Sequence, residues 1–216
     1  MKLIAQLILL FGIAMIHYSC VQAQGEGFSF FDSIFESNID ENKLFQESRD
    51  SVFKQKLKNS KMFLTNNKSY SQEIVFLIDM KIPSGKNRFF IYDLKKDSIS
   101  KSALVAHGAG STLSADSLVF SNTPNSYQTS LGNYKVGNSY AGNFGKSYKL
   151  HGLDKTNSKA FDRLVVLHPY QCVPDEEQEY PICESLGCPM VSNNFMESLH
   201  RVIDSSKKPI LMVIYY

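Results

Sequence analysis

Short apolar runs separated by turn residues recur from residue 73 to the C-terminus, and this pattern constrains the fold more than any other feature. The continuous run Ile74–Ile78 suits a buried strand. Residues 88–93 and 98–106 flank a polar turn, as the two strands of a β-hairpin do. A single helical pattern comes late, where Ser192 or Asn193 can cap it. Many short strands with one late helix predict a mainly β domain.

The N-terminal 23 residues have the pattern of a signal peptide. Lys2 supplies a positive start, the apolar run 3–16 is short for a membrane span, and small residues near Ala23 suit cleavage. A lipoprotein signal ending at Cys20 is the alternative and would add a membrane anchor. His17, however, stands where such signals usually carry an aliphatic residue. Either way we expect an exported protein, in the periplasm or cell envelope, where disulfides can form.

Three parts are expected along the chain, of which residues 1–23 are the first. Residues 24–72 form a linker and an amphipathic helical segment, in which apolar residues recur at helical spacing between Ile39 and Leu57. An exposed spacer is the other interpretation of that segment. Residues 73–216 are expected to form the catalytic domain. A net charge of +2 and 20% charged residues do not indicate nucleic acid as a partner.

The cysteine count is informative in an exported protein. Four cysteines less Cys20 leave Cys172, Cys183 and Cys188, and an odd number indicates a free thiol or an intermolecular bridge. Pairing of Cys172 with Cys183 would leave Cys188 free, whereas a Cys183–Cys188 or Cys172–Cys188 disulfide would not. Counting alone does not separate these pairings. The residues around Cys188 favour the free thiol.

The stretch from Arg163 to Val191 carries the chemistry. An apolar run delivers His168, and the turn Ser185-Leu-Gly187-Cys188 follows. A thiol becomes a strong nucleophile as the thiolate, and a nearby imidazole is the usual base that removes its proton. Glycine before the cysteine allows a sharp bend that points N–H groups at a developing oxyanion. We therefore predict Cys188 as the nucleophile, His168 as the base and Gly187 as part of the oxyanion site.

The other histidines have open roles at this stage. His151, in His151-Gly152, is a rival base, a substrate contact or a turn histidine, and its distance along the chain favours a neighbouring role. His107 lies in a Gly-rich loop as a lining or a surface residue, and His200 is expected to be structural. A metal site would use His151, His168 and the three cysteines. Their spacing lacks the paired ligands of structural zinc sites, so we expect no metal and no cofactor.

Ser185-Leu-Gly187-Cys188 after His168 resembles the active-site signature of L,D-transpeptidases with a YkuD-type catalytic domain, in the branch where Gly-Cys-Pro occurs. Several other stretches are similar to that branch, so that the resemblance covers about residues 40–216: 78–84, 88–93, 107–111, 120–122, 130–134 and 150–152. It implies a β-sandwich-like catalytic domain with an N-terminal helix and one late helix. It also implies that a backbone carbonyl can orient the histidine.

The resemblance further implies an enzyme that acts on peptidoglycan stem peptides. A tetrapeptide stem would acylate Cys188 with release of D-Ala, and the amine of a second stem would take the acyl group to form a cross-link. Many relatives have Arg two residues after the nucleophile, where this chain has Met190. We therefore expect substrate contacts from other residues: His151, Ser185, Tyr170, Arg163 and Lys149.

Two other functions stay open. Water as the acceptor would make the same thioester enzyme an L,D-carboxypeptidase or an amide hydrolase of peptidoglycan. A non-catalytic domain that binds the cell wall, with structural cysteines, is the third possibility.

Overall fold

A computed structural model describes residues 43–44, 46–114 and 117–216, and the chain divides into two compact units, Met1–Phe53 and Lys54–Tyr216. The predicted signal peptide, Cys20 and the linker over 24–38 lie outside the described residues. Within the described ranges, no helix has the length and apolar character needed to cross a membrane. Apart from residues 46–53, all features below belong to the second unit.

The N-terminal helix extends over residues 46–66. The end predicted at Leu57 was wrong, because Leu57 and Leu64 continue the apolar face and both are buried. At the C-terminal end, the side-chain amide of Asn67 donates to the Phe63 carbonyl over 2.8 Å and replaces a missing helical hydrogen bond.

Within the described residues, ten strands form two sheets. The smaller sheet pairs β4 (Thr112–Ser114) with β5 (Ser117–Leu118), after the short 3-10 helix η1 (Ala109–Ser111). The larger sheet has eight strands in the order β3-β2-β1-β10-β6-β7-β8-β9. Their bounds are β1 (Ile74–Asp79), β2 (Phe89–Asp93), β3 (Ser98–Ala103), β6 (Gly132–Gly142), β7 (Gly145–Gly152), β8 (Val166–Pro169), β9 (Met190–Val191) and β10 (Leu211–Tyr215).

The inner strands β1 and β10 pair in parallel, with Phe76 opposite Met212. Both strands are continuous apolar runs and are buried on both faces, which is the usual composition of parallel strands inside a sheet. The next pairs, β10 with β6, β6 with β7 and β7 with β8, are antiparallel. At the far end of the sheet, β8 and β9 are again parallel.

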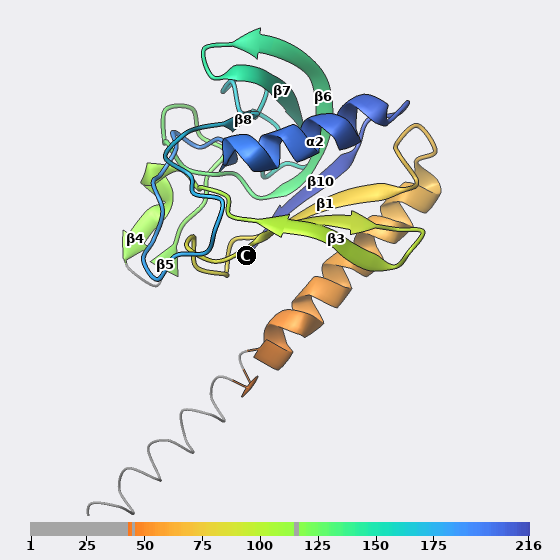
Figure 1. Cartoon of the computed structure of the whole chain (residues 1–216), viewed down its shortest axis with the longest axis horizontal. Helices are drawn as coiled ribbons and strands as arrows, with labels where there is room; N and C mark the ends of the chain where they lie inside the picture. Colours follow the sequence, from red (N-terminus) through yellow and green to blue (C-terminus); the bar gives the residue numbers. More distant parts are fainter. Residues whose placement is uncertain (1–42, 45, 115–116) are drawn as a thin grey trace, which may run out of the picture. The chain divides into compact units, whose positions relative to one another are not determined.

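The late helix α2 (Asn193–Ser205) begins where the sequence predicted. The Ser192 hydroxyl accepts a hydrogen bond from the Phe195 N–H over 3.1 Å, which caps the first turn. Figure 1 shows α2 lying between strands β6–β8 and the strands β1 and β3. Phe195, Met196 and Leu199 are buried there in the main apolar core. A mainly β fold with an N-terminal helix and one late helix is therefore confirmed.

The topology has a direct consequence for the predicted chemistry. Strand β8 carries His168, and β9 follows the Gly187-Cys188 turn. Since β8 and β9 are parallel neighbours, with His168 opposite Met190, two segments separated in the sequence lie side by side at the end of the sheet.

Candidate active site

The structure pairs Cys172 with Cys183 in a disulfide, with 6.1 Å between their Cα atoms. Cys188 is the free cysteine of the described residues and is partly exposed. The disulfide closes the loop between β8 and the Ser185 turn. The pairing that the cysteine count left open is therefore the one that leaves a thiol at Cys188.

The Cys188 thiol lies against the backbone of β8 and the residues just before it. The Val166 N–H donates to the Cys188 Sγ over 3.4 Å, and the Sγ approaches the Leu164 carbonyl at 3.8 Å. Val166 precedes His168 by two positions on the same strand. In the part of the chain that the structure describes, no hydrogen bond joins the Sγ to the His168 ring. The thiol thus contacts the backbone of the strand that carries His168, two positions before the histidine.

His168 is buried and its ring is held from two sides. Its Nδ1 lies 3.0 Å from the Pro169 carbonyl, and because a carbonyl only accepts, Nδ1 carries the hydrogen and Nε2 keeps its lone pair. The Phe144 ring stacks on the imidazole, with 4.2 Å between centroids. Burial lowers the pKa of His168 below 6.5, with the Pro169 hydrogen bond acting in the opposite direction. At neutral pH the ring is therefore a neutral base with a defined tautomer.

The thiol has the opposite shift. Burial raises the pKa of Cys188, while the Val166 N–H and the positive charge of Arg163 act to lower it. A raised pKa of the thiol and a lowered pKa of the imidazole keep both groups neutral before substrate binds. Activation of the sulfur then requires proton transfer at the moment of attack.

The turn before Cys188 depends on Gly187, whose φ of +114° lies in the region that favours glycine. The Ser185 hydroxyl accepts from the Gly187 N–H over 3.1 Å and donates to the Cys188 carbonyl over 2.6 Å. Ser185 thus shapes the turn. The Gly187 N–H is already bonded to Ser185, whereas no hydrogen bond within the described residues occupies the Cys188 N–H, which can therefore donate to an oxyanion.

A second segment supports this turn from the side. The Ser185 N–H donates to the His107 carbonyl and the Ala109 N–H donates to the Ser185 carbonyl, each over 2.8 Å. A side chain at Gly108 would bring a Cβ within 2.7 Å of the Gly187 Cα, so the two glycines allow the two backbones to approach closely. The nucleophile turn is therefore built against residues 107–109.

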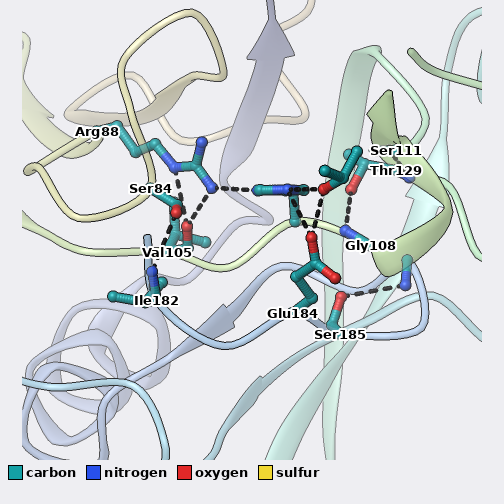
Figure 2. Close-up of polar contacts among 12 residues, drawn as sticks. Ser84, Arg88, Val105, Gly108, Ser111, Thr129, Ile182, Glu184 and Ser185 are labelled. Atoms are coloured by element: carbon teal, nitrogen blue, oxygen red, sulfur yellow. Dashed lines mark hydrogen bonds and ion pairs between the residues drawn. The ribbon is translucent and has the colours of Figure 1, made fainter. Parts of the chain in front are cut away.

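Beneath this segment lies a buried polar network (Figure 2), centred on Arg88, of which 1% is exposed. Its guanidinium donates to the Val105 carbonyl over 2.9 and 2.7 Å and to His107 Nδ1 over 2.8 Å. His107 Nε2 therefore carries the hydrogen and lies 3.0 Å from the Thr112 hydroxyl, which donates to Glu184. Burial and the Arg88 charge lower the pKa of His107 to about 4.

The network resolves the open role of His107, which is neither a surface residue nor a lining one. It is a buried, neutral link between Arg88 and Glu184, the residue directly before Ser185. Sequence reasoning missed Arg88 and Glu184. The available signal was an arginine at the start of an apolar strand, since a buried cation requires several acceptors nearby.

Arg163 lies beside the turn, and its guanidinium is bound to the backbone of a neighbouring loop. It donates to the Ser121 carbonyl over 2.8 Å and to the Gln128 carbonyl over 2.6 Å. A Cβ on Gly187 would lie 3.4 Å from its Nη2 atom. In this arrangement, Arg163 braces the loop over 121–128 and places a positive charge near the thiol.

The structure separates the two remaining predicted residues. Tyr170 follows His168 and meets the Phe144 ring edge-on, with 5.7 Å between centroids. His151 lies on β7 opposite Lys135, stacks on Phe161 at 4.8 Å and lines a cavity away from the Ser185 turn. His200, expected to be structural, lies on α2 with its Nδ1 3.1 Å from the Tyr148 hydroxyl. Among the described residues, no group of three or more His, Cys, Asp or Glu side chains is arranged to hold a metal ion.

Comparison with solved structures finds several distant neighbours. The L,D-transpeptidase from Xylanimonas cellulosilytica is 15% identical, with a TM-score of 0.37 over 66% of this chain and 60% of that one. The helical cell shape determining protein Pgp2 from Campylobacter jejuni is 13% identical, with a TM-score of 0.44 over 66% and 47%. Bd1075 from Bdellovibrio bacteriovorus is 14% identical, with a TM-score of 0.42 over 69% and 49%. The chain thus spans about half to three fifths of the length of these structures.

No curated protein matches the chain. The family YkuD_2, described as L,D-transpeptidase catalytic domain, matches residues 45–215, which is most of the chain. The match includes β8, the Gly187-Cys188 turn and α2, and it confirms the resemblance inferred from the residues. The chain belongs to this family of L,D-transpeptidase catalytic domains, which act on the bacterial cell wall.

Proposed function

We propose that this chain is an exported L,D-transpeptidase that cross-links peptidoglycan stem peptides through a thioester on Cys188. One observation carries the proposal: the free thiol accepts from the N–H of Val166 on β8, and two positions further along that strand is a histidine whose Nδ1 donates to the Pro169 carbonyl. That hydrogen bond directs the basic Nε2 away from the backbone and keeps it free to accept a proton.

In the first half of the reaction, the Cys188 Sγ attacks the carbonyl carbon of the bond after the third residue of a tetrapeptide stem. The thiol proton passes to His168 Nε2 as the C–S bond forms. The Cys188 N–H donates to the developing oxyanion, an interaction worth about 3 kcal/mol in comparable sites. The C–N bond then breaks, and His168 returns the proton to the leaving D-Ala amine.

In the second half, the amine of another stem attacks the thioester carbon. His168 Nε2 takes a proton from that amine, the new amide forms and the C–S bond breaks. The departing sulfur recovers the proton as a thiol, so that the enzyme returns to its starting state. Arg163 favours the transient negative charge on sulfur because its positive charge lies near the thiol.

The same thioester transferred to water would make an L,D-carboxypeptidase. Exposure around the thiol favours this as the second candidate. Leu164 and Leu186, on either side of Cys188, leave 78% and 72% of their surface exposed. An open rim admits water as well as a second stem, so the ratio of cross-linked to hydrolysed product measures how well the bound acceptor excludes water.

Intact-mass spectrometry of the full chain with a disaccharide-tetrapeptide tests the proposal. We expect an adduct equal to the stem minus D-Ala, followed by cross-linked dimer, and no adduct for Cys188→Ala. The matched control is the double variant Cys172→Ala/Cys183→Ala, which lacks the disulfide and retains the thiol, and we expect it to form the adduct. Free tripeptide without dimer would identify the carboxypeptidase, and an adduct that persists in Cys188→Ala would refute the assigned nucleophile.

A further inference from the structure

A cavity of about 810 Å³ lies beside β6 and β7, outside the thiol site. The end of α2 and residues 206–209 close one side, and Phe161 closes another. Its charged and aromatic lining includes Lys135, Lys149, His151, Phe161, Lys207 and Lys208. A cavity of this size accommodates a small peptide or sugar ligand.

The charge of the cavity is strongly unbalanced. Asp204 is the carboxylate among its lining residues, and it is already bound by Lys146 and by the Tyr148 hydroxyl at 2.8 Å. Within the described ranges, Lys135, Lys149 and Lys207 form no ion pair with a carboxylate. Lys149 instead lies over the Phe161 ring, with its Nζ 5.6 Å from the centroid. Such an excess of cations attracts anionic groups.

The positive charges of these lysines also act on His151. Its ring packs over Gly137, where a Cβ would lie 2.8 Å from Nε2, and stacks on Phe161. Burial lowers the pKa of His151, and the charges of Lys135 and Lys149 lower it further. The imidazole is therefore neutral at pH 7 and can exchange hydrogen bonds with a ligand while the lysines supply the charge.

The cavity is one strand away from the thiol. On β7, Lys149 lies opposite Val166 of β8, and the Val166 N–H donates to the Cys188 Sγ. Adjacent strands are separated by about 5 Å, which is shorter than two residues of an extended peptide. Phe161 is connected to the thiol through Leu164. The Leu164 N–H donates to the Phe161 carbonyl, and the Leu164 carbonyl lies 3.8 Å from the Cys188 Sγ. A stem peptide of a few residues that reacts at Cys188 is therefore long enough to span the distance to Lys149.

We propose that this cavity binds the carboxylates of an acidic stem peptide while that peptide, or its partner stem, occupies the thiol site. The identity of the ligand rests on the proposed function, whereas its chemistry, a carboxylate-bearing peptide, rests on the lysines themselves. Lys135 and Lys149 pair with the carboxylates, and the Phe161 and Tyr140 rings provide the apolar walls. This site supplies the anion recognition that Met190 cannot provide after the nucleophile.

Isothermal titration calorimetry on the full-length Cys188→Ala variant tests the site without turnover. The ligands are a disaccharide-tetrapeptide with free carboxylates and the same compound with amidated carboxylates. We expect Lys135→Gln and Lys149→Gln each to weaken binding of the free-carboxylate ligand about fivefold, as one exposed charge pair does. Lys135→Arg keeps the positive charge, and we expect it to retain the affinity that Lys135→Gln loses. The amidated ligand binds all of these variants with the same, weaker affinity.

Lys58→Gln is the matched control, since Lys58 is an exposed lysine on the N-terminal helix, and it leaves the affinity unchanged. Equal affinity of the two ligands for the parent variant, or equal effects of Lys58→Gln and Lys135→Gln, would overturn the proposed site. Acylation is measured separately, by intact mass in chains that retain Cys188. Lysine-dependent binding without any Cys188 adduct would refute the transpeptidase proposal and leave the carboxylate site standing. An adduct on Cys188 together with binding that does not depend on the lysines would refute the carboxylate site and leave the transpeptidase proposal standing.

Discussion

Two adjacent strands of the sheet each present a histidine stacked on a phenylalanine. On β8, Phe144 lies over His168 at 4.2 Å, and on β7, Phe161 lies over His151 at 4.8 Å. The surroundings of the two rings differ in their polar partners. The His168 Nδ1 donates to the Pro169 carbonyl, whereas His151 lies among Lys135 and Lys149 without a hydrogen bond to the described residues.

The difference in polar partners explains how one residue type can have two roles. A backbone hydrogen bond fixes the tautomer and the orientation of His168, which a base requires. Burial and the neighbouring cations keep His151 neutral but leave its orientation to a ligand, which a binding site requires. The aromatic stack is common to both and therefore does not decide the role. Substitutions at the two histidines and at their neighbours test this contrast.

Replacing each histidine by alanine gives the largest contrast. We expect His168→Ala to slow acylation of Cys188 about a thousandfold, because it removes the base. His151→Ala removes one hydrogen-bonding group of the binding site and costs about fivefold. The rate of adduct formation, followed by mass spectrometry at tetrapeptide concentrations below saturation, measures both. Comparable losses in the two variants would contradict the assignment of the base to β8.

Arg163 tests the charge near the thiol. Arg163→Gln removes a cation that favours the thiolate, so the pKa of Cys188 rises and alkylation by iodoacetamide at pH 8 slows about tenfold. Arg163→Lys keeps the charge and is the control, and it retains most of the alkylation rate. Equal rates for Arg163→Gln and the unmodified chain would exclude this electrostatic role.

The pH profile of acylation tests the burial of His168. Since burial lowers the pKa of His168 below 6.5, the neutral base persists as the pH falls past 6.5, and the acid limb of the profile lies below that value. Phe144→Ala admits water to the ring and raises this pKa toward 6.5. We expect the acid limb to move up and the rate at pH 6 to fall about threefold. Phe161→Ala is the matched control, and an acid limb that moved equally in both variants would contradict the argument.

The smallest effect concerns the pKa of His151. In the double variant Lys135→Gln/Lys149→Gln, loss of both cations raises the pKa of His151 toward 6.5, although burial, the larger cause, keeps it below that value. NMR titration of the histidine ring protons measures this change, with His151→Gln to assign the signal. We expect His168 to titrate as in the unmodified chain. A shift of His168 alone would place the lysine field at β8 instead of β7.

The fold was largely predictable because its signals are local. The apolar run at Ile74–Ile78, the hairpin of β2 and β3 and the Ser192 cap each depend on residues a few positions apart, and the structure confirms them. The end of strand β6 was harder to predict, because its pairing with β7 continues past a bulge between Val136 and Ser139 as far as Gly142.

The candidate site was less predictable, since much of it depends on contacts between distant segments. Arg88 and Glu184 carry no local motif, and their connection through His107 exists only after residues 88, 107 and 184 meet in the fold. Arg163 was expected to contact substrate because it is a cation near the site. The fold instead provides two backbone carbonyls that bind it first.

By itself, the sequence determined which chemical groups are present and in what order: a strand ending in His168, a glycine turn, and a thiol at Cys188. Tertiary structure decided which sulfur stays free, which histidine is oriented, and which lysines lie together without carboxylates. The physical reason is that a reactive group is defined by its burial, its hydrogen-bond partner and the charges nearby. In this chain those neighbours come from strands and loops that are distant in sequence and meet only at the end of the sheet.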